Sequence, residues 1–126
     1  MKWRVEQINE KQLAEVVTRW NLDSPQDGTE IRESLRLAGW AIAQTGQQGR
    51  LHFVVQGRDG TLSYRMNSER ADVATAILKT DPMLAKGLML GFILQIELSQ
   101  IQDSLRLGFE TDGLIQWVAM LSIDAE

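Results

Sequence analysis

Residues 104–121 have the sequence SLRLGFETDGLIQWVAML, and this stretch decides the expected fold. Two runs rich in apolar residues flank the pair Asp112-Gly113. Such a pair is the strongest short-range signal for a β-hairpin, because the tight turn needs positive φ angles that glycine adopts without steric cost. We therefore predict a strand, a two-residue turn and a returning strand that ends near Ile123.

A second stretch of the same kind lies earlier in the chain, at residues 50–67, with the sequence RLHFVVQGRDGTLSYRMN. Its Asp59-Gly60 pair again separates two runs in which apolar and polar residues alternate. Strict alternation is the pattern of a strand that buries one face. The two hairpins together predict an antiparallel sheet.

Apolar residues at helical spacing predict helices around these hairpins. The predicted helices cover residues 9–20, 29–44 and 71–78. A loop is expected at residues 21–28, which are dense in turn-forming residues. Residues 83–102 fit both a helix and a strand, and their length and their Gln and Glu content favour the helix. The expected fold is an α+β domain over residues 1–126, in which helices pack against an antiparallel sheet.

Composition and charge favour a small protein with an ordinary apolar core. The 126 residues include 44% hydrophobic residues, and 13 Lys and Arg against 17 Asp and Glu give a net charge of −4. The basic residues are scattered, whereas binding to nucleic acid needs them clustered. The longest apolar stretch, residues 88–96, is shorter than the roughly 20 residues of a membrane span. With no signal peptide at its start and no cysteine, the chain is expected in the cytoplasm, with no nucleic-acid or membrane partner.

No catalytic or metal-binding motif is recognisable in the chain. His52 is the one histidine and cysteine is absent, so a metal site would consist of carboxylates alone. Acidic pairs such as Asp23 with Asp27 are better explained as surface charges. Neither a nucleophile elbow nor a phosphate-binding glycine motif occurs. We therefore expect no catalytic residue, no metal ligand and no cofactor, and we predict that the chain is not an enzyme.

Two segments are more apolar than a single core face requires. They are the return strand at residues 114–121 and the stretch at residues 83–93. An excess of this kind indicates either burial in the core on both faces or contact with a partner across one of them. Core burial is the simpler interpretation of each tryptophan, but aromatic residues are also favoured anchors of protein interfaces. The candidate interaction surface consists of Ile115, Trp117, Met120, Leu88 and Phe92.

The order of the predicted elements and the closing sequence LRLGFETDGLI at residues 105–115 resemble the type III secretion chaperone-like superfamily, and within it the YbjN-like domains. The similarity lies in residues 31–40, 50–66 and 105–121. Secretion members of that superfamily are small dimers that hold a secreted client in an extended form. The resemblance implies a non-catalytic, chaperone-like homodimer that binds a segment of a client protein through its sheet and helix surfaces.

A second resemblance leads to a different expectation. Residues 80–88, TDPMLAKGL, are similar to the Asp-Pro-x-x-x-x-Gly stretch of the YCII-related family, whose members are ferredoxin-like α+β dimers, some with enzymatic activity. This alternative implies small-molecule binding or catalysis near Asp81 and His52. It also makes residues 90–98 the last strand of the fold, and it leaves the second hairpin unexplained.

Overall fold

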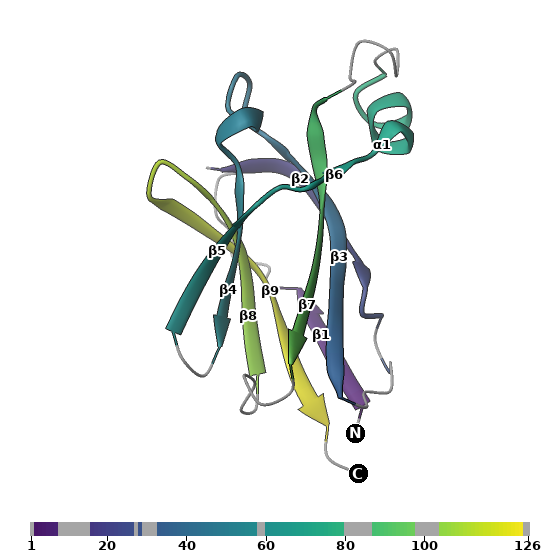
Figure 1. Cartoon of the computed structure of the whole chain (residues 1–126), viewed down its shortest axis with the longest axis vertical. Helices are drawn as coiled ribbons and strands as arrows, with labels where there is room; N and C mark the ends of the chain where they lie inside the picture. Colours follow the sequence, from purple (N-terminus) through teal and green to yellow (C-terminus); the bar gives the residue numbers. More distant parts are fainter. Residues whose placement is uncertain are drawn as a thin grey trace.

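Antiparallel strands make up most of the structure, a computed structural model of the chain (Figure 1). It describes residues 2–7, 16–26, 28, 33–57, 60–79, 87–97 and 104–124. In these residues the strands are β1 (Lys2–Gln7), β2 (Val17–Ser24), β3 (Ser34–Ala43), β4 (His52–Gly57), β5 (Gly60–Arg65), β6 (Ser68–Glu69), β7 (Met89–Glu97), β8 (Ser104–Thr111) and β9 (Leu114–Asp124). The described helices are the short 3-10 helix η1 (Gln48–Arg50) and the α-helix α1 (Ala71–Ala76).

The strands form two antiparallel sheets. The first sheet has the order β1-β9-β8-β4-β5, and the second sheet has the order β2-β3-β7-β6. Figure 1 shows the chain crossing from the first sheet to the second between β5 and β6. Only two residues, Met66 and Asn67, separate these strands, so a single stretch of chain joins one edge of each sheet.

A cluster of three phenylalanines ties the two sheets together in the core. Phe53 of β4 stacks on Phe92 of β7, with ring centroids 4.0 Å apart and planes 10° apart, and Phe109 of β8 packs against both rings. All three side chains are at most 3% exposed. Gly39 of β3 lies opposite Phe92, and a Cβ atom there would lie 2.8 Å from Cζ of the ring. The missing side chain therefore makes room for the phenylalanine cluster.

A side-chain amide closes the seam between the first sheet and the start of β2. Oε1 of Gln116, on β9, accepts hydrogen bonds from the backbone N–H groups of Val16 and Val17, at 2.9 and 3.0 Å. Both valines are buried, at 0% and 1% exposed. Because buried backbone donors need a partner, Gln116 supplies what a neighbouring strand would otherwise provide.

Both predicted hairpins are confirmed. β4 pairs with β5 from His52 to Gly57, and β8 pairs with β9 on either side of the second Asp-Gly turn. Asp112 and Gly113 have φ angles of 49° and 87°, as the tight turn requires. The helix predicted at residues 71–78 is confirmed as α1.

The predicted α+β fold class is wrong, since the described residues are mostly strand and contain one α-helix. The helix predicted over residues 9–20 is wrong at its end, because residues 17–20 belong to β2. Residues 9–15 lie outside the described residues. The predicted loop over residues 21–28 is also partly wrong, because β2 continues to Ser24.

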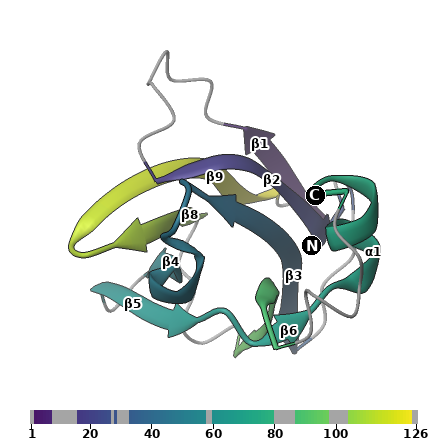
Figure 2. The same cartoon turned by 90° about the horizontal axis from the view of Figure 1, so that it is seen from above.

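The helix predicted over residues 29–44 is wrong, because residues 34–43 form β3. Alternate residues of β3 are buried in the core, as Leu35 and Leu37 are, while Trp40 and Ile42 on the other face pack against α1. Figure 2, the view from above, shows α1 outside the sheets on the side of β3. A strand that is covered on both faces has no clear alternation, so its apolar residues also fit a helical spacing.

The helix predicted over residues 83–102 is also wrong where the chain is described; residues 83–86 and 98–102 lie outside the described residues. Residues 89–97 form β7, the third strand of the second sheet. Phe92 and Ile96 are buried in the core, while Leu90 is buried in the cluster that includes α1. Pairing with β3 over seven residues overrides the helical preference of the individual residues.

Candidate interaction surface

Three of the five predicted contact residues lie in one row on the outer face of the first sheet, along β9: Ile115, Trp117 and Met120. The pairing of β8 with β9 shifts by one residue between Leu107 and Gly108, where Val118 is left without a partner. Strict alternation would place Met120 on the opposite face from Trp117. The bulge therefore brings the three side chains to one face.

Trp117 packs against this face through contacts with two residues of β8. A Cβ atom at Gly108 would lie 2.9 Å from Cε3 of the indole, so the ring packs on the glycine. The Arg106 guanidinium lies 4.4 Å from the ring centroid, which is a cation–π contact. Trp117 is thus half-buried by its own sheet, while Met120 is 37% exposed and offers more of its surface to a partner.

The structure separates the other two predicted residues from this row. Phe92 is buried in the phenylalanine cluster and offers no surface. Leu88 is half-buried against the residues that surround α1. A surface patch containing all five residues therefore does not form.

The structure contains a surface that sequence reasoning missed, along the edge strand β5. Leu62 of β5 lies opposite Val55 of β4, so both side chains are on the core face of the first sheet. Val55 is 4% exposed, whereas Leu62 is 54% exposed. Among the described strands β5 pairs only with β4, so alternate residues of β5 point their backbone N–H and C=O groups away from the sheet. The alternation of Leu62 with its neighbours was visible in the sequence, but nothing there marks β5 as an edge.

The alternative site near Asp81 and His52 is only partly described. Asp81 lies outside the described residues, and His52 is a half-buried residue of β4 whose Nδ1 lies 2.9 Å from the Arg50 carbonyl oxygen. Residues 90–97 are indeed strand, but β8 and β9 follow them, so they are not the last strand of the fold. The mostly-β structure also differs from the α+β class that both resemblances imply.

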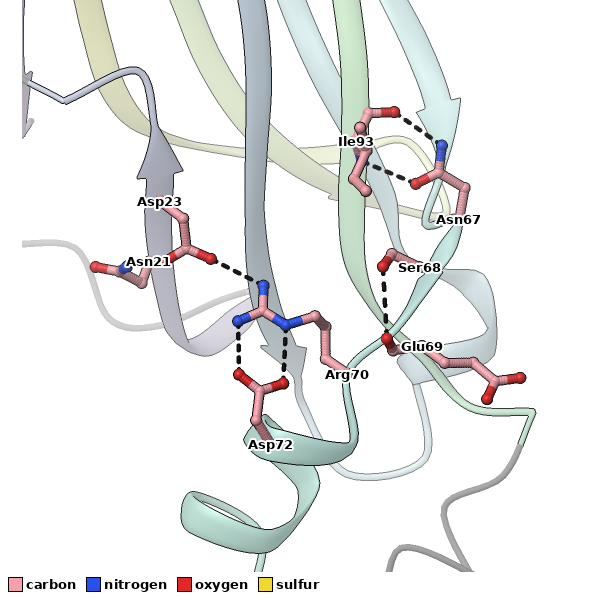
Figure 3. Close-up of polar contacts among 8 residues, drawn as sticks. All are labelled: Asn21, Asp23, Asn67, Ser68, Glu69, Arg70, Asp72 and Ile93. Carbon is pink, nitrogen blue, oxygen red and sulfur yellow. Dashed lines mark hydrogen bonds and ion pairs between the residues drawn. The ribbon is translucent and has the colours of Figure 1, made fainter. Parts of the chain in front are cut away.

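Arg70, between β6 and α1, binds two carboxylates (Figure 3). Its Nε and Nη2 donate to the two Asp72 carboxylate oxygens at 2.9 and 2.8 Å, and its Nη1 donates to Asp23 of β2 at 2.8 Å. The hydrogen bonds from Arg70 lower the pKa of Asp72 to about 2, and those to Asp72 and Asp23 raise the pKa of Arg70. A Cβ atom at Gly91 would lie 2.7 Å from Cγ of Arg70, so the glycine lets this side chain cross the sheet.

Figure 3 also shows how the second sheet is extended beside this cluster. The Asn67 side chain donates to the Ile93 carbonyl oxygen and accepts from the Ile93 N–H, both at 2.9 Å. One amide side chain thus takes the place of one residue of a neighbouring strand. Together with the Arg70 contacts, this arrangement has a structural role, in that it fastens the crossing chain to β7 and, through Asp23, to the edge strand β2.

Comparison of the chain with protein-family models, curated proteins and solved structures finds no match. Among the described residues, no group of three or more His, Cys, Asp or Glu side chains is placed to hold a metal ion. No helix in the described ranges has the length and apolar character that a bilayer span needs. The resemblances, the homodimer and the class of function stay predictions.

Proposed function

We propose that this chain is a non-catalytic protein-interaction module that binds an extended segment of a partner protein along β5. The observation that supports this most is the 54% exposure of Leu62, a core-facing side chain on an edge strand. Strand addition to an open sheet edge is an established mode of recognition, in which backbone hydrogen bonds supply affinity and pockets for alternate side chains supply specificity.

The sequence of β5 supports the proposal. Natural sheets protect their edges with charged side chains, proline or bulges, because an open edge otherwise pairs with another chain. Residues 60–64 contain neither a charged residue nor a proline, and the pairing of β4 with β5 runs without a register shift. The one charged residue of the strand, Arg65, is at its end. Over these five residues, the edge therefore carries none of these protective features within the part of the chain that the structure describes.

The expected energetics set the kind of partner. Covering the exposed half of Leu62 contributes about 1 kcal/mol, given about 1.5–3 kcal/mol for burial of a whole apolar side chain. That is too little for binding by itself, so most of the affinity comes from the backbone ladder. The partner is expected to be a segment with alternating apolar residues and no proline. We place this interaction in the cytoplasm, because the absence of cysteine suits a reducing compartment.

Synthetic peptides with alternating apolar residues, titrated into nitrogen-15-labelled protein, test the proposal. The expected result is chemical-shift change at residues 60–65, with slower exchange of alternate β5 amides. Leu62→Asp is expected to abolish binding, because it places a charge against the apolar segment. The matched control, Met120→Asp on the outer face of the first sheet, is expected to bind as the unaltered chain does.

Three outcomes would contradict the proposal. Peptides that shift the residues around Met120 instead of β5 would move the interaction to the row on β9. Binding that survives Leu62→Asp would show that the edge is not used. A dimer in sedimentation that Leu62→Asp dissociates would identify the occupant of the edge as a second copy of the chain.

A further inference from the structure

A hollow of about 280 Å³ lies where β4 begins, β5 ends and β7 begins. It is separate from the exposed Leu62 and its lining is of two kinds. Its polar lining includes His52 and Arg65, and its apolar lining is formed by Leu51, Met66, Leu88 and Met89. This combination of a few convergent polar groups with an apolar wall is typical of a site for a small molecule.

The charge of the hollow is set by Arg65. His52 and Arg65 are directly opposite each other in the ladder of β4 and β5, so their side chains project from the same face, with Cβ atoms about 5 Å apart. Arg65 forms no ion pair within the described residues, and none of the described residues that line the hollow is acidic. A guanidinium without a counter-ion favours a carboxylate, which it binds through two parallel hydrogen bonds.

The hydrogen bond of His52 determines which second group the ligand must carry. Its Nδ1 lies 2.9 Å from the Arg50 carbonyl oxygen. A carbonyl oxygen only accepts, so Nδ1 carries the proton and Nε2 of the neutral ring is left as an acceptor. The matching ligand group is a hydroxyl, which donates its proton to Nε2.

The apolar wall sets the rest of the ligand. Leu51 and Met66 are 3% and 7% exposed, and Met89 at the rim is 36% exposed. The rim is held in place by Gln48, whose amide accepts from Ala43 N–H at 2.8 Å and donates to the Met89 carbonyl at 3.1 Å. The Gln48 side chain is therefore already bonded to backbone and contributes rigidity to the site.

We propose that this hollow binds a small hydroxycarboxylic acid with a short hydrocarbon chain. The carboxylate pairs with Arg65, the hydroxyl donates to Nε2 of His52, and the hydrocarbon chain packs on Leu88 and Met89, the apolar lining residues that are still accessible. The volume is just below the roughly 300–1,000 Å³ of typical ligand pockets, so the ligand is of metabolite size. This inference is independent of the function proposed for β5.

The experiment titrates nitrogen-15-labelled protein with α-hydroxyhexanoate, hexanoate and hexanol at millimolar concentrations. α-Hydroxyhexanoate is expected to shift the amides of residues 48–52 and 65–66, hexanoate to bind several-fold more weakly, and hexanol not to bind. Arg65→Gln is expected to weaken binding of α-hydroxyhexanoate about tenfold. His52→Phe is expected to remove the preference for α-hydroxyhexanoate over hexanoate.

The control variant is Arg36→Gln, which removes an exposed arginine from β3 and is expected to leave binding unchanged. Amide spectra of each variant report that it is folded. Equal binding of all three compounds, or an affinity that Arg65→Gln leaves unchanged, would overturn the proposal. So would the absence of shifts in the hollow with all three compounds.

Discussion

The two Asp-Gly hairpins have similar sequences and different surroundings. The β8–β9 hairpin lies inside the first sheet, with β4 on one side and β1 on the other, whereas the β4–β5 hairpin ends the sheet at β5. On the core face, Leu121 of β9 is 0% exposed and Leu62 of β5 is 54% exposed. We conclude that the turn residues specify a hairpin, whereas the strands beside it determine how much of the hairpin is buried.

The largest expected effect comes from making the same substitution in both hairpins. Leu121→Ala is expected to lower the free energy of unfolding by about 2–5 kcal/mol, because it leaves a cavity in the core. Leu62→Ala is expected to cost about 0.5 kcal/mol or less, as for surface positions. Urea unfolding followed by tryptophan fluorescence measures both values. Equal losses would show that the two strands are buried alike in solution.

A second test concerns the β8–β9 hairpin, in which Trp117 packs on Gly108. Gly108→Ala is expected to cost about 1–3 kcal/mol through overpacking, because the new Cβ would lie 2.8 Å from the Gln116 carbonyl oxygen and 2.9 Å from the indole. The matched control is Gly49→Ala, where no atom lies within 4 Å of the new Cβ. Urea unfolding of both variants gives the comparison, and a Gly108→Ala variant as stable as the control would contradict the described packing.

A third test removes the hydrogen bonds by which Gln116 joins the β8–β9 hairpin to the start of β2 in the second sheet. Gln116→Met keeps the size of the side chain but removes the acceptor of two buried N–H groups, with an expected cost of about 1–2 kcal/mol. Faster hydrogen exchange is expected at Val16 and Val17. The control is Gln95→Met, at an exposed amide bonded only to Ser34 among the described residues. Unchanged exchange at the two valines would show that Gln116 does not close this seam.

The smallest expected effect concerns the ion pair of Asp72 with Arg70, which follows the β4–β5 hairpin in the chain. Asp72 has a pKa of about 2 in the folded chain, below its usual 3.8, so the unfolded chain binds more protons between these values. The stabilising contribution is therefore fully present above about pH 4 and is lost as the pH falls toward about 2. Because the carboxylate is 67% exposed, we expect less than about 1 kcal/mol.

Urea unfolding of the unaltered chain and Asp72→Asn measures this contribution. The difference in stability is expected to be constant from about pH 7 to about pH 4 and to shrink at lower pH. A difference that grows as the pH falls would contradict the assigned contact with Arg70.

Part of the candidate surface was predictable and part was not. Alternation along β9 places Ile115 and Trp117 on one face, as the sequence suggests. Met120 joins them because of the bulge at Val118, which no local residue pattern announces. Phe92 lies in the core between the two sheets. Its apolar side chain is there because of core packing and not because of contact with a partner.

The local sequence was enough to predict the two hairpins, in which Gly60, Asp112 and Gly113 have positive φ, and the short helix α1. These depend on residues close together in the chain. That residues 34–43 and 89–97 are strands depends on the tertiary structure, because β3 and β7 pair with each other from distant parts of the chain. The tertiary structure also places Leu62 at the edge of the first sheet as described and brings Met89 of β7 beside His52 and Arg65, since neighbours from separate hairpins and sheets are absent from any window of sequence.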